Sequence, residues 1–260
     1  MKISRRPARF VVLGLLASIV SLTRVLAASS EEQPSVQDAP AVRVPQLTQA
    51  RLIAALRSKI AIDPLVVRGD PYATSHAKEP PHPLAGTVCG VQFERDQVHY
   101  HLSTFATAVA ARTAGFAVTH FAACGTCSTL QDLAVYLDKP DLTAPVRRCG
   151  IKIDASASLT CLEDLGFSTA CAQTWAYNAQ HTRRQCFGVC IRSWIEGEAP
   201  TREDGRFNAC LQCDEDRSGP IFKATAGRTR RNSGIRSSIP RPAEEIAPVV
   251  HDYVPDLAPR

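Results

Sequence analysis

Ten cysteines, all between Cys89 and Cys213, constrain the fold of this 260-residue chain more than any other feature. An even number of cysteines behind an N-terminal export signal favours disulfide bonds, and each bridge typically stabilises a fold by about 2–4 kcal/mol. We therefore predict that all ten are in disulfides, although spacing alone leaves their connectivity open. The ten are Cys89, Cys124, Cys127, Cys149, Cys161, Cys171, Cys186, Cys190, Cys210 and Cys213.

Residues 1–27 have the layout of a secretory signal peptide. A basic start precedes an apolar run over residues 10–22, and small or apolar residues at 25–27 offer a cleavage point. An uncleaved anchor is the alternative, but the run is short for a membrane span. The sequence therefore predicts a secreted or periplasmic protein with no membrane attachment after signal removal, and leaves the general and twin-arginine export routes open.

The charge of the mature chain argues against nucleic acid as a partner. The whole sequence has 30 Lys and Arg against 25 Asp and Glu, a formal charge of +5. Five of the basic residues and none of the acidic ones belong to the signal, which leaves 25 of each. A nearly neutral chain without a recognition module lacks the electrostatic footprint of a nucleic-acid-binding protein.

Composition divides the rest of the chain into three parts. Residues 28–85 are poor in large apolar side chains and rich in proline, which predicts a disordered region with one helix at about 48–62. Residues 86–240 contain every cysteine and are predicted to be the globular domain. Residues 241–260 are predicted to form a C-terminal tail.

The first part of the globular domain has the pattern of a small sheet. Alternating apolar residues predict strands at 87–93, 97–105 and 116–121, with a short alanine-rich helix at 106–114. A strand, a helix and a strand in this order suggest one parallel crossover. The predicted fold class is α+β: a small mixed β-sheet with one parallel crossover, packed beside a disulfide-stapled helical half.

The helical half is predicted from periodicity and capping signals. Helices are expected at about 127–137 and 159–165, and Ser168 can cap the next one. Thr182 and Gln185 have the spacing of a capping box, which predicts that a separate helix starts there.

Cys124 and Cys127 are separated by two residues, follow a predicted strand and open a predicted helix. Over residues 116–137 this arrangement resembles the active site of thioredoxins. In that family a helix N-terminus lowers the pKa of the first thiol and makes it reactive. The resemblance implies a thiol–disulfide oxidoreductase as an alternative to two structural cysteines.

Four later cysteines fall within the spacing range of a zinc site. Two of them are four residues apart, two are three apart, and nineteen residues separate the pairs. Oxidation competes with zinc in an export compartment, so disulfides are favoured here as well. The four are Cys186, Cys190, Cys210 and Cys213.

Three histidines are candidates for catalysis or for metal binding. His99 and His101 lie two apart on a predicted strand and therefore share a face, and His120 ends a neighbouring strand. With Asp132 or Asp214 they could bind copper, iron or zinc, or act as acids and bases. The alternative is that they are surface or internally hydrogen-bonded polar residues.

Residues 217–241 contain seven basic residues and no acidic one. Arginine presents a rigid fork of donors to carboxylate or phosphate, and glycines let backbone amides approach an anion. Internal pairing with the acidic run 214–216 and a solvated basic tail are the alternatives. The candidate anion-binding residues are Lys223, Arg228, Arg230 and Arg231.

These patterns favour an exported, disulfide-rich protein that binds or acts on a small anionic molecule through the arginine–glycine segment. Chemistry assisted by histidine, with or without a transition metal, is part of this hypothesis. The alternatives are the thiol–disulfide oxidoreductase and a structural or interaction protein without an active site. Whether the chain is an enzyme, and its oligomeric state, stay open.

Overall fold

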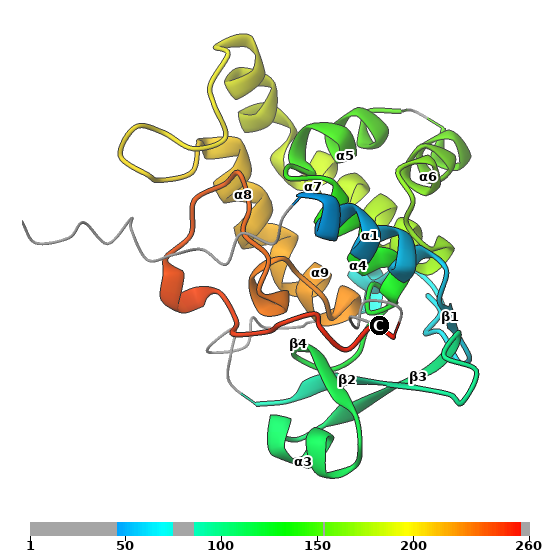
Figure 1. The fold of residues 1–260 in the computed structure, drawn as a ribbon. Coiled ribbons are helices and arrows are strands. Elements are labelled where there is room, and N and C mark those ends of the chain that lie inside the picture. Colours follow the sequence, from blue (N-terminus) through cyan, green and yellow to red (C-terminus); the bar gives the residue numbers. More distant parts are fainter. Residues whose placement is uncertain (1–45, 75–85, 153, 256–260) are drawn as a thin grey trace, which may run out of the picture. The chain divides into compact units, whose positions relative to one another are not determined.

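The structure is a computed structural model that describes residues 46–74, 86–152 and 154–255; the predicted signal peptide lies outside these ranges. The described chain is mixed α+β, as predicted, with strands in its first half and helices dominating its second (Figure 1). The elements are α1 (Gln46–Arg57), β1 (Ile60–Ala61), α2 (Pro71–Thr74), β2 (Val88–Phe93), β3 (His99–Phe105), α3 (Ala108–Thr113), β4 (Ala117–Phe121), α4 (Leu130–Asp138), α5 (Thr143–Gly150), α6 (Ala155–Asp164), α7 (Thr169–Ile195), α8 (Ala209–Arg217), α9 (Gly219–Ala226) and the 3₁₀ turns η2 (Arg231–Ser233) and η3 (Ala243–Glu245).

The four strands form one mixed sheet in the order β1-β3-β2-β4. Strand β2 is antiparallel to both β3 and β4, so these two strands run in the same direction and α3 joins them in the predicted crossover. The hydrogen-bonded parallel pair is β1 with β3. The predicted small mixed sheet is therefore confirmed, and β2 lies between the two strands of the crossover.

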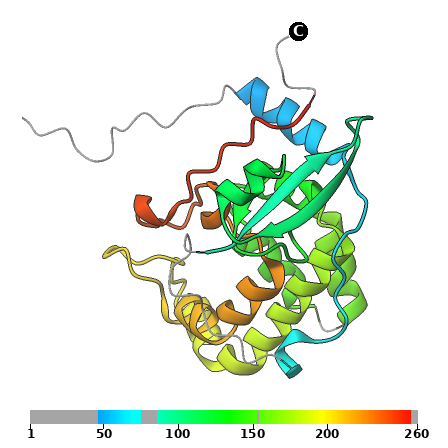
Figure 2. The ribbon, with the colours of Figure 1, turned by 90° about the horizontal axis from the view of Figure 1, so that it is seen from below.

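Helix α4 lies between two hydrophobic clusters. Leu130 and Leu133 face a cluster that contains Tyr100 of the sheet and Leu56 of α1. The following residues Val135 and Tyr136 belong to the second cluster, which fills the helical half. Figure 2 shows the sheet lying across one side of the helices. Burying apolar side chains on two sides of one helix joins the sheet to the helical half.

Helix α7 is one continuous helix, which corrects the prediction of two. Ser168 caps it as expected, because its side chain accepts a hydrogen bond from the amide of Cys171. The predicted second start at Thr182 lies inside α7. The Thr182 hydroxyl contacts the Asp214 carboxylate and Ser218 instead of capping a helix, and no proline interrupts the run from 169 to 195.

All ten cysteines are in disulfides, as predicted, and the described chain has no free cysteine. Five bridges link the sheet to the loop before α4, the same loop to α7, α5 to α6, and α7 twice to α8. The pairs are Cys89–Cys124, Cys127–Cys171, Cys149–Cys161, Cys186–Cys213 and Cys190–Cys210. The four cysteines with zinc-site spacing are therefore oxidised and clamp the α7–α8 hairpin.

The packed part of the chain extends beyond the predicted range 86–240. The helix predicted at 48–62 ends at Arg57, and Ile60–Ala61 form β1 instead. Leu56 is fully buried against α4, and Val254 in the predicted tail is buried in the same cluster. Of the predicted disordered and tail regions, residues 28–45, 75–85 and 256–260 lie outside the described residues. None of the helices in the described part of the chain combines the length and the apolar character that crossing a membrane requires.

Candidate functional site: a buried polar centre and an arginine-lined cleft

Arg228 is completely buried and uses all five of its N–H groups inside the protein. Its Nε donates to the carbonyl of Cys127 at 3.1 Å, and one terminal nitrogen donates to the carbonyl of Thr119 and to Ser233 Oγ, both at 3.2 Å. The other terminal nitrogen donates to Thr119 Oγ1 at 2.8 Å and to the carbonyl of Ser128 at 3.0 Å. Burial lowers the pKa of Arg228. This guanidinium holds the backbone together and is not available to a ligand.

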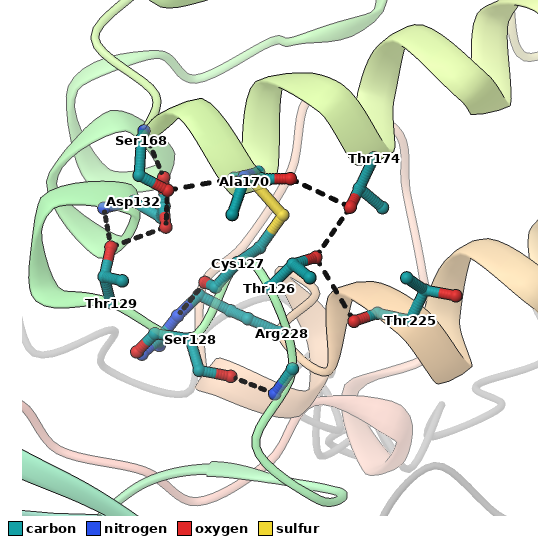
Figure 3. Close-up of a disulfide and its surroundings, with 12 residues drawn as sticks. Thr126, Cys127, Ser128, Thr129, Asp132, Ser168, Ala170, Thr174, Thr225 and Arg228 are labelled. Atoms are coloured by element: carbon teal, nitrogen blue, oxygen red, sulfur yellow. Dashed lines mark hydrogen bonds between the residues drawn. A yellow bond between two sulfur atoms is a disulfide. The ribbon is translucent and has the colours of Figure 1, made fainter. Parts of the chain in front are cut away.

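Asp132 lies in the first turn of α4 and is also fully buried. Its carboxylate accepts hydrogen bonds from Thr129 Oγ1 at 2.5 Å, and from the amide and hydroxyl of Ser168 at 2.8 and 2.9 Å (Figure 3). Burial raises the pKa of Asp132 to about 6, although these hydrogen bonds lower it. The carboxylate joins the start of α4 to the start of α7 and contacts none of the candidate histidines.

His120 and Ser128 form a pair that the sequence analysis missed. His120 Nδ1 lies 2.7 Å from the carbonyl of Phe121, so it carries the proton, and Nε2 accepts from Ser128 Oγ at 2.8 Å. A hydroxyl beside an oriented imidazole is the arrangement of a nucleophile and its base. Both side chains are fully buried here, and a Cβ on Gly125 would meet the carbonyl oxygen of Thr225 at 2.4 Å. The pair is therefore sealed from substrate by close backbone packing.

The three candidate histidines do not converge, which corrects the predicted catalytic or metal cluster. His120 is in register with Cys89 on the core face of the sheet. His99 and His101 flank the buried Tyr100, so they point to the opposite face. There His99 lies 2.6 Å from Asp96, and His101 Nε2 is 2.7 Å from a carboxylate of the same turn. Within the described ranges no three His, Cys, Asp or Glu side chains gather as metal ligands.

The two cysteines of the thioredoxin-like pattern are bonded to different partners. Cys124 pairs with Cys89 of the sheet, and Cys127 pairs with Cys171 of α7. Cys127 and Cys171 are fully buried. The resemblance predicted a redox pair of Cys124 with Cys127, and the structure shows two structural bridges at these positions instead.

The four candidate anion-binding residues are engaged inside the protein, but of the four only Lys223 pairs with the acidic run 214–216 in the way the internal-pairing alternative expected. Besides the buried Arg228, Arg230 donates to the carbonyl of Tyr136 at 2.9 Å and to that of Lys139. Arg231 pairs with Glu245, and Lys223 Nζ lies 3.2 Å from a carboxylate oxygen of Glu215. Of these four residues, Arg231 also lines a cleft.

That cleft has a volume of about 300 Å³ and lies in the segment that follows Arg230. Arg241 stacks on Phe207 at 4.3 Å from the ring centre and lies 2.6 Å from Glu215. Arg236 is exposed, and its guanidinium has no partner among the described residues. The lining combines three guanidinium groups with apolar side chains. Its residues are Arg231, Ile235, Arg236, Ser237, Ile239, Pro240, Arg241 and Ile246.

The sequence analysis counted Arg236 and Arg241 among the seven basic residues but did not single them out. Apart from charge, these two had no signal that separated them from Arg228 and Arg230. A sequence does not show which arginines turn inward to carbonyl groups and which line a surface. Ile235, Ile239 and Ile246 line the cleft together with these arginines. Their positions in the sequence are only a weak signal of an amphipathic cleft, because the fold is needed to show that they lie side by side.

Comparison with known proteins gives one match. Residues 155–249 are similar to a family of unknown function (DUF8771), a range that contains α7, α8, α9 and the whole cleft. No curated protein and no solved structure matches the chain.

Proposed function

We propose that this protein binds a small amphipathic anion, a carboxylate or phosphate with a short apolar group, in the arginine-lined cleft. The observation that carries the proposal is the combination of three guanidinium groups with Ile235, Ile239 and Ile246 in one cleft of about 300 Å³. Ligand pockets usually pair an apolar lining with a few oriented polar groups, and this volume is at their small end. The cleft therefore suits a ligand of modest size.

The charges around the cleft support an anion as the ligand. Glu215 orients Arg241, and Glu245 orients Arg231. Burial alone would raise the pKa of Glu215, but Lys223 and Arg241 hold it below its ordinary value, so the carboxylate stays ionised at neutral pH. Arg236 has no such acidic neighbour and contributes the uncompensated positive charge. An arginine fork of this kind recognises carboxylate and phosphate oxygens.

We propose binding rather than catalysis at this site. The three candidate histidines do not line the cleft, and the buried Ser128–His120 pair belongs to another part of the fold. A binding site needs only the guanidinium groups and the apolar wall.

The disulfides indicate where this binding takes place. Five bridges point to an extracellular or periplasmic protein, because thiols are kept reduced in the cytosol. We further propose that residues 1–27 direct this export.

Thermal unfolding in the presence of anions tests the proposed function. Hexanoate and butyl phosphate should raise the melting temperature, whereas the uncharged hexanol should not, because a ligand at ten times its Kd adds about 1.4 kcal/mol of stability. Arg236→Gln should abolish the shift. Arg112→Gln, an exposed arginine on α3, is the matched control and should leave it unchanged. The proposal is wrong if neither anion shifts the transition, or if Arg236→Gln shifts as far as wild type.

A further inference from the structure

Residues 246–254 form a segment at the surface that we call the strap. They follow η3 without regular secondary structure, and in Figure 1 they run (red) from η3 toward the sheet. Val250 and Asp252 are exposed, whereas Ala247 and Val254 near the two ends are buried. The strap is therefore held at separate points along its length and faces solvent between them.

The start of the strap is also a wall of the arginine-lined cleft. Ile246 lines the cleft together with Arg231, and the amide of Ala247 donates to the carbonyl of Arg231 at 2.8 Å. The strap then packs directly on the backbone of Gly234. A Cβ built on Gly234 would meet the carbonyl oxygen of Val249 at 2.6 Å and that of Ala247 at 2.9 Å. Opening the strap therefore removes Ile246 from the cleft and frees the turn that carries Arg231.

His251 holds the other half of the strap through both of its ring nitrogens. Nε2 donates to the carbonyl of Ser233 at 2.9 Å, so the proton of the neutral ring is on this nitrogen. Nδ1 lies 2.9 Å from the hydroxyl of Tyr253, and this hydroxyl lies 2.8 Å from Thr119 Oγ1 of β4. Beyond it, Val254 is buried in the cluster of the sheet, α1 and α4. The neutral form of His251 thus belongs to the closed strap.

The charges around His251 oppose a second proton on its ring. Burial and Arg228 lower the pKa of His251 to about 4. In the open strap the ring meets water and takes up its proton near pH 6.5, so a falling pH favours the open form. The titratable and charged groups of the segments packed against His251 are Arg228, His120 of β4, Arg231 of η2 with its partner Glu245, and Tyr253 and Asp252 of the strap.

We propose that residues 246–254 are a proton-sensitive strap that closes the arginine-lined cleft: acid favours its opening, and a ligand in the cleft favours its closure. The opening is a property of the fold and needs no ligand, whereas closure by a ligand rests on the proposed function. Protonation and ligand binding act on one strap, so each weakens the other. The cleft therefore binds its ligand more firmly at neutral pH than in acid.

Modification of an introduced thiol tests the opening. Val254→Cys places a thiol beneath the strap, and Val250→Cys places one on its outer side, where the wild-type side chain is 70% exposed. N-ethylmaleimide should modify Val254→Cys far more slowly, and the ratio of the two rates cancels the intrinsic pH dependence of a thiol. From pH 7.5 to pH 5 this ratio should rise about 30-fold, because the pKa of His251 is about 4 in the closed strap and near 6.5 in the open one.

Two histidine variants and urea serve as controls. In a His251→Gln background the ratio should be the same at both pH values, whereas the exposed His99→Gln should keep the rise. Opening of the strap alone exposes little surface, so about 1 M urea should leave the ratio nearly unchanged. A ratio that follows global unfolding in urea would show that the strap does not open by itself, and would overturn the proposal.

Hexanesulfonate tests the link to the cleft, because its sulfonate stays ionised at both pH values. At about ten times its Kd it should slow the modification of Val254→Cys about tenfold, since it binds the closed form. Arg236→Gln, which removes the uncompensated guanidinium of the cleft, should abolish this protection.

The two parts of the proposal fail in different ways. A ratio that is constant between pH 7.5 and pH 5, or that rises equally in His251→Gln, would overturn the opening. Hexanesulfonate that binds without slowing the modification of Val254→Cys would show that the strap does not control the cleft. If it binds at neither pH, the proposed function fails and closure by a ligand fails with it, while the pH dependence of the ratio still decides whether the strap opens.

Discussion

Arg228 satisfies polar groups from three separate segments, and lysine could not replace it. Lysine has three donors where arginine has five, and all five are used here. We expect Arg228→Lys to lower the free energy of unfolding by about 3 kcal/mol, because at least two buried acceptors lose their donor. Urea denaturation with the disulfides intact measures this. Arg236→Lys, at an exposed position, should change the free energy of unfolding by less than about 0.5 kcal/mol. Equal midpoints for Arg228→Lys and wild type would contradict this role.

Arg228 also shows why the direction of a single side chain is hard to predict from sequence. Seven basic residues without an acidic one between 217 and 241 predicted a need for partners. Arg228 meets that need with carbonyl and hydroxyl oxygens, and every residue has a carbonyl. Backbone acceptors leave no trace in the sequence, so the inward direction of Arg228 could not be predicted. The pairing of Glu215 with Lys223 and Arg241 could be predicted, because the acidic residues at 214–216 stand next to the basic segment in the sequence.

Among the elements, those with a strong local pattern could be predicted and those built by long-range contacts could not. The strands expected at 87–93, 97–105 and 116–121 correspond to β2, β3 and β4, because alternation and turn residues are local signals. Strand β1 has two residues and exists through its pairing with β3. Disulfide connectivity and the convergence of side chains from different elements likewise depend on the fold, which is why the histidine cluster was predicted wrongly.

The α7–α8 hairpin yields a prediction at the level of elements. Since α8 buries no residue, the two bridges rather than apolar packing hold it against α7. Serine at all four hairpin cysteines should release α8 and the preceding loop, and leave the sheet and α4 folded. Hydrogen exchange should then speed up at least tenfold in residues 196–217 and stay unchanged in β2 and β3. Loss of protection in β2 and β3 as well would show that the hairpin bridges support the whole fold.

Replacing the Cys127–Cys171 bridge is the matched control for the hairpin. This bridge joins the loop before α4 to α7 and is buried in the main core, so serine at both positions should destabilise every element together. A bridge removed from a core typically costs about 2–5 kcal/mol, with the unsatisfied hydroxyls adding to it. We therefore expect the hairpin bridges to stabilise only the α7–α8 hairpin, and the Cys127–Cys171 bridge to stabilise the whole fold.

For the molecule as a whole, buried titratable groups decide how folding responds to acid. Burial and Arg228 lower the pKa of His251 to about 4, and burial holds the pKa of His120 well below its usual value. Each histidine therefore contributes stability that is complete above pH 6.5 and is lost as the pH falls toward its folded pKa. Burial raises the pKa of Asp132 to about 6, so its contribution is complete below pH 4 and is lost as the pH rises through 6.

Burial raises the pKa of Asp214 as well as that of Asp132, whereas Lys223 and Arg241 lower the pKa of Glu215. The two histidines and Glu215 lose stability in acid and the two aspartates oppose them, so acid should destabilise the fold on balance.

His251 alone should remove roughly 2 kcal/mol between pH 6.5 and 4.5, because over this range the unfolded chain takes up a proton on this side chain and the folded protein largely does not. Denaturation midpoints across this range should fall more steeply for wild type than for His251→Gln, whose replaced side chain takes up no proton. His99→Gln, an exposed control, should keep the wild-type slope. Parallel slopes for His251→Gln and wild type would mean that the folded protein already carries a charged His251 beside Arg228, contrary to the burial of both.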